Sequence, residues 1–115
     1  MLTIAIAVGV PMLLFGAYLG LVKYSEAERI EKTILFKYGS ANNYYQDGQF
    51  ERASEAYSEI LEFDEKQEKA AHELGKIYNR FNQCKMAQEH FEKYVKIFPD
   101  SSRILEGYKI AQSCK

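Results

Sequence analysis

Residues 68–101 read EKAAHELGKIYNRFNQCKMAQEHFEKYVKIFPDS, and this stretch decides the fold because its pattern occurs once before in the chain. Small, aromatic and turn-forming residues recur in it at one constant spacing from their counterparts in the earlier copy. The earlier copy places them at Ala41, Tyr44, Gly48, Phe50, Ala53, Tyr57, Ile60 and Glu65, and the later copy at Gly75, Tyr78, Asn82, Cys84, Ala87, Phe91, Tyr94 and Pro99. Small residues suit the close approach of two helices, and Gly or Asn suits a turn between them. The pattern therefore predicts two helix–turn–helix units.

This pattern resembles the tetratricopeptide repeat (TPR), a helix–turn–helix unit of about 34 residues that stacks into a solenoid. In the later copy the residues that carry the resemblance are Leu74, Gly75, Tyr78, Ala87, Phe91 and Pro99. The earlier copy departs from the family, since Lys37 and Ser40 stand where a bulky apolar pair is usual and Glu65 replaces the closing proline. The resemblance covers residues 34–115 and implies an all-α fold.

The repeats, at about 34–67 and 68–101, predict helices over residues 34–46, 50–63, 67–81 and 84–97. Pro99 and Ser101 then predict a helix start, followed by a capping helix over residues 102–114. The apolar residues of this helix that we expect to cover the second repeat are Ile104, Leu105, Tyr108 and Ile110. Gly39 either breaks the first helix or is tolerated within it. Because such stacks usually need about three units, this short array should lean on the helix before it, a second copy or a partner.

Residues 1–22 contain no charged side chain, so all 15 Lys/Arg and all 16 Asp/Glu lie in residues 23–115. A helix of this length reaches roughly 30 Å, the thickness of a bilayer's hydrocarbon core. We predict a transmembrane anchor over residues 1–23, a connecting helix over 24–36 and a TPR-like domain over 34–115. Gly16 and Gly20 form a GxxxG pair that would pack the anchor against another helix, unless they are simply the glycines common in membrane helices. A cleaved signal peptide is the rival interpretation, but a basic start is missing.

Basic residues from Lys23 onward favour a single-pass membrane protein with a cytoplasmic repeat domain over a periplasmic or lumenal one. The cysteines point the other way. Cys84 and Cys114 each lie 15 residues from Pro99, so a hairpin folded about Pro99 would bring them side by side as a possible disulfide. A disulfide would imply an oxidising compartment. The alternative is two ordinary cysteines, with Cys84 buried as a small apolar residue.

The sequence predicts no catalytic residues, no metal site and no cofactor. His72 and His90 lie on different predicted helices with no partner at the spacing of a catalytic triad. The cysteines form no CxxC pair. Basic residues are interleaved with acidic ones instead of forming the stripe typical of nucleic-acid-binding proteins. We therefore expect neither an enzyme nor a nucleic-acid-binding protein.

The resemblance implies a binding groove lined by the first helix of each repeat. Carried onto this chain, the groove residues are Tyr38, Asn42, Tyr45, Gln46, Lys69, His72, Lys76, Asn79, Arg80 and, at the cap, Arg103. Their mixture of aromatic and basic groups suits an acidic or polar-aromatic segment. The family's clamp for chaperone tails is not reproduced, because Tyr38, Glu73 and Gly107 stand where other residues are expected. The alternative is a solvated groove without a ligand.

We therefore expect a membrane-anchored adaptor or accessory subunit that mediates protein–protein interaction in, or assembly of, a larger membrane protein complex. Its partners would be subunits of that complex and the lipid bilayer, which residues 2–22 would contact. Two alternatives remain. One is a tethered receptor that recruits soluble client proteins through the groove. The other is a self-associating scaffold, in which the chain forms a homo-oligomer.

Overall fold

The computed structural model describes residues 25–115 and divides the chain into a unit over Met1–Thr33 and a unit over Ile34–Lys115. Within the first unit, residues 25–33 are described, and they are helical. The Lys32 ammonium lies 3.1 Å from the Glu28 carboxylate one turn earlier, and the Thr33 hydroxyl donates to the Arg29 carbonyl at 2.8 Å. These are local contacts on a solvent-exposed helix, which individually contribute only a few tenths of a kcal/mol.

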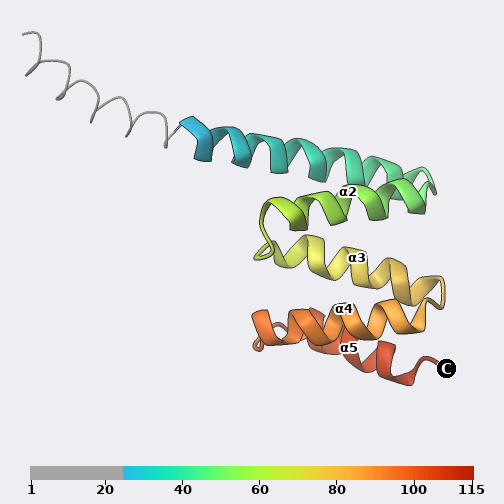
Figure 1. Cartoon of the computed structure of the whole chain (residues 1–115). Coiled ribbons are helices and arrows are strands. Elements are labelled where there is room, and N and C mark those ends of the chain that lie inside the picture. Colours follow the sequence, from blue (N-terminus) through green and yellow to red (C-terminus); the bar gives the residue numbers. More distant parts are fainter. Residues whose placement is uncertain (1–24) are drawn as a thin grey trace, which may run out of the picture. The chain divides into compact units, whose positions relative to one another are not determined.

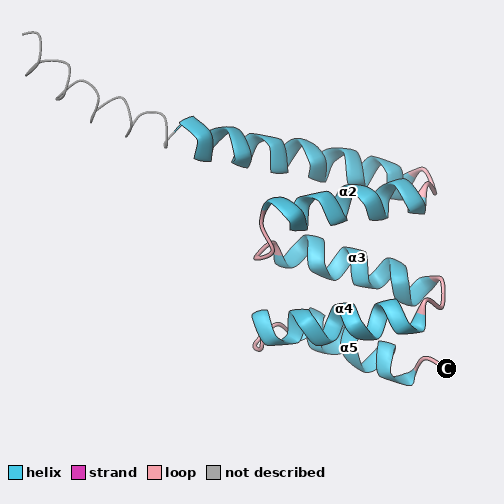
Figure 2. Cartoon of the chain, in the orientation of Figure 1, coloured by secondary structure: helices cyan, strands magenta, loops and turns pink. Residues whose placement is uncertain are grey.

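The second unit consists of successive antiparallel helices joined by short loops (Figures 1 and 2). Its opening helix covers residues 34–46 and includes Gly39, which is therefore tolerated within the helix. The others are α2 (Phe50–Phe63), α3 (Glu68–Arg80), α4 (Cys84–Ile97) and α5 (Ser102–Ser113). The bounds of α2 and α4 agree with those predicted, while α3 is one residue shorter at each end and α5 ends one residue earlier. The expectation of an all-helical domain is confirmed for the described residues.

The turns that precede α2 and α4 occupy equivalent positions in the two repeats and are built in the same way. Gly48 and Asn82 both have positive φ, of 78° and 54°. The amide that follows each of them returns to a carbonyl five residues earlier, from Gln49 to Tyr44 at 2.8 Å and from Gln83 to Tyr78 at 2.9 Å. This is the hydrogen bond of a Schellman motif, which ends a helix at a left-handed residue. The predicted turn role of Gly48 and Asn82 is confirmed.

The core forms two clusters that meet at α3, the helix that contacts α2, α4 and α5. Ala70, Leu74 and Ile77 of α3 pack in the first cluster, against the opening helix and α2. Ala71, on another side of α3, packs in the second cluster, against α4 and α5. Alanines that are fully buried at the helix crossings are Ala41, Ala53, Ala70, Ala71, Ala87 and Ala111. Short side chains at these positions allow the close helix packing that the sequence predicts.

Phe91 of α4 is fully buried and lies between Gly75 of α3 and Gly107 of α5. A Cβ atom added at Gly75 would lie 2.2 Å from the Phe91 ring, and one added at Gly107 would lie 2.3 Å from it. Both distances are far below van der Waals contact, so each helix needs a glycine where it crosses the ring. The close approach at Gly75 was predicted, whereas the one at Gly107 was not.

The capping helix buries a different set of residues from the one predicted. Ile104, Gly107 and Ala111 are buried, while Leu105 is 39% exposed and Ile110 is 54% exposed. Residues 104, 107 and 111 share one helical face, and Leu105 and Ile110 lie on another. The prediction that all four apolar residues of this helix cover the second repeat was therefore wrong for Leu105 and Ile110.

The structure joins Cys84, the first residue of α4, to Cys114, which follows α5, through a disulfide. Their Cα atoms lie 5.4 Å apart, within the usual range for such a bond. Folding about Pro99 brings the start of α4 beside the end of α5, as the equal spacing in the sequence implies. The bond fastens α5 to α4 at the end remote from Pro99.

The predicted transmembrane fold requires correction. Within residues 25–115, no helix combines the length and the apolar character that a bilayer span demands. The physical reason is that these helices are amphipathic and carry charged side chains along their length. The anchor predicted over residues 1–23, with Gly16 and Gly20 of its packing motif, lies outside the described residues. The structure thus gives no support to a single-pass membrane protein, to a membrane location or to the sidedness derived from it.

Candidate protein-binding surface

The predicted groove residues occupy three neighbouring helices of the second unit. We call this set of ten residues the cationic face; it consists of Tyr38, Asn42, Tyr45, Gln46, Lys69, His72, Lys76, Asn79, Arg80 and Arg103. Five of these residues lie on α3. They are three or four positions apart along the helix, except that Arg80 directly follows Asn79. Residues at this spacing lie on one side of a helix. The side-chain contacts show which members of the set meet.

Two cations of α3 meet the aromatic side chains of the opening helix and α2. The Lys76 Nζ lies 5.1 Å from the centre of the Tyr45 ring, and the Arg80 guanidinium lies 4.5 Å from the centre of the Phe50 ring. Arg80 Nη1 also donates to the Tyr45 hydroxyl at 3.4 Å. A cation held over an aromatic face is oriented without being neutralised. Arg80 forms no ion pair with a carboxylate among the described residues and keeps its charge available to a ligand.

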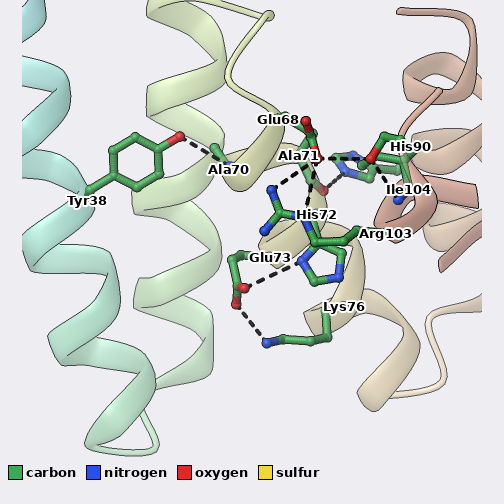
Figure 3. A network of polar contacts seen from close by, with 11 residues as sticks. Tyr38, Glu68, Ala70, Ala71, His72, Glu73, Lys76, His90, Arg103 and Ile104 are labelled. Atoms are coloured by element: carbon green, nitrogen blue, oxygen red, sulfur yellow. Dashed lines mark hydrogen bonds and ion pairs between the residues drawn. The ribbon is translucent and has the colours of Figure 1, made fainter. Parts of the chain in front are cut away.

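Tyr38 serves mainly to join the opening helix to α3. Its hydroxyl donates to Gln67 Oε1 at 3.1 Å. The same hydroxyl accepts from the Ala70 amide at 3.2 Å (Figure 3). The Ala70 amide is one of the first amides of α3, which lack partners within the helix, and the Gln67 side chain does not cap it. Burial raises the pKa of Tyr38, which the hydrogen bond from Ala70 partly offsets. The hydroxyl is thus already hydrogen-bonded within the fold. The part of Tyr38 that a ligand could contact is its ring, and Lys69 Nζ lies 5.5 Å from the centre of that ring.

Glu73 lies between two cationic-face residues of its own helix (Figure 3). Its carboxylate is 2.9 Å from Lys76 Nζ and 3.5 Å from His72 Nδ1. The longer contact is too distant for a good hydrogen bond, and His72 Nδ1 is buried without a hydrogen-bond partner. Burial lowers the pKa of His72, and the nearby Glu73 carboxylate opposes that shift. His72 is therefore mainly neutral at neutral pH, and Glu73 offsets much of the Lys76 charge.

Arg103 is engaged at the other end of the cationic face. Its guanidinium donates to Glu68 Oε1 at 3.0 Å from Nη2 and 3.2 Å from Nε, and the Ser101 hydroxyl donates to the same oxygen at 2.9 Å (Figure 3). Hydrogen bonds from Ser101 and then Arg103 lower the pKa of Glu68. Ser101 also caps α5, since its hydroxyl accepts from the Ile104 amide at 3.3 Å. Arg103 thus ties the starts of α3 and α5 together.

The remaining members of the cationic face either contact another helix or are exposed to solvent. Asn79 Nδ2 donates to the Gly107 carbonyl at 3.2 Å, whereas Asn79 Oδ1 is buried and has no hydrogen-bond partner. Asn42 and Gln46 are exposed on the last turns of the opening helix. Tyr38, Asn79 and Arg103 are accordingly structural contacts between helices. Tyr45, Lys69 and Arg80 are left as the side chains best placed to meet a ligand.

Sequence reasoning missed two contributors to this surface, Phe50 and Glu73. Phe50 was assigned only to the repeat pattern. In the structure the Arg80 guanidinium lies over the Phe50 ring, and the centre of this ring is 5.1 Å from the centre of the Tyr45 ring. Glu73 was considered only as a departure from the chaperone-tail clamp. The signal that could have revealed it is the spacing of Glu73 and Lys76, three residues apart on one helix.

His90 packs among aromatic side chains and is not part of the cationic face. Its ring packs 4.7 Å from that of Tyr94 and 5.5 Å from those of Tyr78 and Phe91, measured between ring centres. Nε2 lies 2.7 Å from the Ala71 carbonyl oxygen, and because that oxygen only accepts, Nε2 carries the proton. His90 therefore packs against residues of the second core cluster.

No protein-family model, no curated protein and no solved structure matches this chain. The resemblance to the tetratricopeptide repeat consequently rests on the chain's own residues.

Proposed function

We propose that this protein is a helical-repeat adaptor or accessory subunit that binds an acidic segment of a partner protein on its cationic face. The observation that carries the proposal is the arrangement of Arg80 over the Phe50 ring and of Lys69 over the Tyr38 ring, both without an ion-pair partner among residues 25–115. Oriented cations beside aromatic surface suit carboxylates and aromatic side chains in one peptide. The role is recognition of a protein, without catalysis or a cofactor.

The repeat geometry supports this mode of binding. The starts of α2 at Phe50 and α4 at Cys84 are separated by the same length of chain as the starts of α3 at Glu68 and α5 at Ser102. Helix hairpins repeated at such a period are typical of solenoids whose surfaces bind extended or helical peptides. A transient receptor for client proteins would use the same surface, and the dissociation rate of the complex distinguishes it from a stable subunit.

The test replaces the two exposed cations, Lys69→Gln and Arg80→Gln, in one variant of the full chain. Neither cation forms an ion pair with a carboxylate among residues 25–115, so the change leaves no acidic partner unpaired. Fluorescence anisotropy with a labelled peptide of alternating Glu and Tyr measures the affinity. Two partly exposed charge contacts predict about fivefold weaker binding. The affinity for this peptide should also fall as salt is raised, because exposed charges are screened.

The matched control is Lys85→Gln with Lys109→Gln, which removes the same charge from exposed positions on α4 and α5. This control variant should bind the Glu–Tyr peptide as the unchanged chain does. Equal losses in both variants would mean that net charge alone attracts the peptide, and the cationic face would then have no specific role. Absence of saturable binding to the unchanged chain would also contradict the proposal.

A further inference from the structure

An open groove of about 780 Å³ lies on a different surface of the second unit. α2 forms one side of this groove, and the end of α3 and the start of α4 contribute the rest. Its lining residues are Gly48, Phe50, Glu51, Ser54, Glu55, Ser58, Glu59, Glu62, Ile77, Tyr78, Phe81, Gln83 and Met86. Tyr78 is two positions from Lys76, which places the two side chains about 200° apart around α3. This groove, which we call the acidic groove, therefore faces another side of α3 than the cationic face, and the Phe50 ring lies at the boundary between the two surfaces.

One side of the acidic groove is a row of carboxylates. Four residues lie along one stripe of α2 and line the groove: Glu51, Glu55, Glu59 and Glu62. The lining residues of the groove include no Lys or Arg. Only Glu59 has an ion-pair partner among the described residues, Lys37 of the opening helix. Like charges at a spacing of four residues repel one another and destabilise the helix that carries them. A partner that brings positive charge to this row would remove the repulsion as well as gain attraction.

The end of the groove near the α3–α4 turn is apolar. Phe81 and Met86 line it and remain 49% and 48% exposed, and the centres of the Phe81 and Phe50 rings are 5.1 Å apart. A half-exposed methionine beside aromatic rings provides an adaptable apolar contact for a side chain from a partner. The groove thus combines a row of negative charges with an apolar end.

We propose that the acidic groove binds a basic amphipathic helix from another protein. Charge complementarity identifies this occupant: Lys or Arg residues three or four positions apart would face Glu51, Glu55 and Glu62. An apolar residue one or two turns further along that helix would enter the space between Phe81 and Met86. The chain would then hold two partner segments of opposite charge on two surfaces.

The experiment uses a labelled helical peptide with Lys at every fourth position and Leu near one end, titrated with the full chain. Its control peptide carries Glu in place of Lys. Glu51→Gln with Glu55→Gln should weaken binding of the Lys peptide about fivefold, because two partly exposed charge contacts are lost. Met86→Gln should weaken it about tenfold, because the apolar contact is lost. Both changes are at exposed positions, so the fold should be retained.

Glu92→Gln with Glu106→Gln is the matched control, since it removes the same charge from exposed positions outside the groove. This variant should keep the affinity of the unchanged chain, as should Lys69→Gln, which alters the cationic face at the opposite end of α3 from Arg80 and its contact with Phe50. Equal losses in the groove and control variants would overturn the proposal. It would also be overturned if the Lys peptide did not bind, or if the groove changes altered only self-association in sedimentation velocity, which would make a second copy the occupant.

Discussion

At the scale of single residues, the contact of Phe91 with Gly75 and Gly107 explains how α3, α4 and α5 come together. A Cβ atom added at Gly75 or Gly107 would lie only 2.2 or 2.3 Å from an atom of the Phe91 ring. We predict that Gly75→Ala or Gly107→Ala lowers the free energy of unfolding by about 2 kcal/mol, because overpacking outweighs the higher helix propensity of alanine. Urea denaturation measures the change.

Gly39→Ala provides the control for this prediction. Gly39 also lies within a helix, but nothing comes within 4 Å of a Cβ atom added there. Alanine should therefore stabilise the protein by up to about 1 kcal/mol at this position. Replacing the Phe91 ring with a smaller side chain, Phe91→Leu, in the Gly75→Ala variant should restore part of the lost free energy of unfolding. If Gly75→Ala were as stabilising as Gly39→Ala, the packing described for Phe91 would be wrong.

The two glycines also show how far the sequence predicts single contacts. Gly75 recurs at the position of Ala41, so the repeat itself marks it as a close helix crossing. Gly107 lies in the capping helix, where the repeat pattern made no assignment. Its contact with Phe91 depends on how α5 crosses α4, and that crossing is determined by packing in three dimensions. The same reason explains why the exposure of Leu105 and Ile110 was not predicted.

At the scale of elements, the helix ends were predicted well because strong local signals mark them. Gly48 and Asn82 adopt left-handed backbone at the two turns, and Ser101 caps α5 after Pro99. The surfaces of the helices were harder to predict. The glutamates of α2 look like an ordinary solvated face in the sequence, and only the structure places them beside Phe81 and Met86 in one groove.

The disulfide acts at this scale, since it fastens α5 to α4 across a separation of 30 residues in the sequence. Loop-closure entropy for such a separation predicts that its removal lowers the free energy of unfolding by about 3.5 kcal/mol. Cys84→Ser with Cys114→Ser, compared with the unchanged chain with and without reductant in urea denaturation, measures this. Added reductant should destabilise the unchanged chain and leave the double variant unaffected. Equal stability of the two proteins under oxidising conditions would contradict the role of the bond.

At the scale of the whole molecule, the histidines determine how stability depends on pH between pH 5 and 8. Burial lowers the pKa of both His90 and His72 from 6.5, with the Ala71 hydrogen bond opposing the shift at His90 and Glu73 opposing it at His72. The unfolded chain therefore takes up these protons at a higher pH than the folded protein does. The stability that the neutral histidines contribute is complete above about pH 6.5 and is lost as the pH falls below that value toward the lowered pKa of the folded state.

Denaturant unfolding at pH 7.5 and at pH 5.5 tests this prediction. The free energy of unfolding should be lower at pH 5.5, and His90→Gln should reduce the difference because glutamine does not titrate. Glu68 and Asp64 do not interfere, since hydrogen bonds lower the pKa of each carboxyl from its ordinary value of 4.5 or 3.8, well below pH 5.5. A pH dependence that His90→Gln leaves unchanged would contradict the account of His90 as a buried neutral side chain.

The cationic face is the predicted set of groove residues, and the sequence does not show which of its side chains form contacts between helices. The resemblance to the tetratricopeptide repeat implied that Lys69, Lys76 and Arg80 line one groove. It does not reveal contacts between helices, such as those of Tyr38 with Ala70 or Arg103 with Glu68. Because of these contacts, Tyr38 and Arg103 already bind other helices of the protein. The side chains that remain best placed to contact a partner are Tyr45, Lys69 and Arg80.

Binding on the cationic face is the central claim, and amide chemical-shift mapping tests it most directly. The isotope-labelled full chain is titrated with the Glu–Tyr peptide, and the shift of each amide is followed. We predict that the largest changes fall at Tyr45, Lys69, Lys76 and Arg80, with little change along the glutamate row of α2 in the acidic groove. Changes spread evenly over all helices, or concentrated along α2, would contradict the claim.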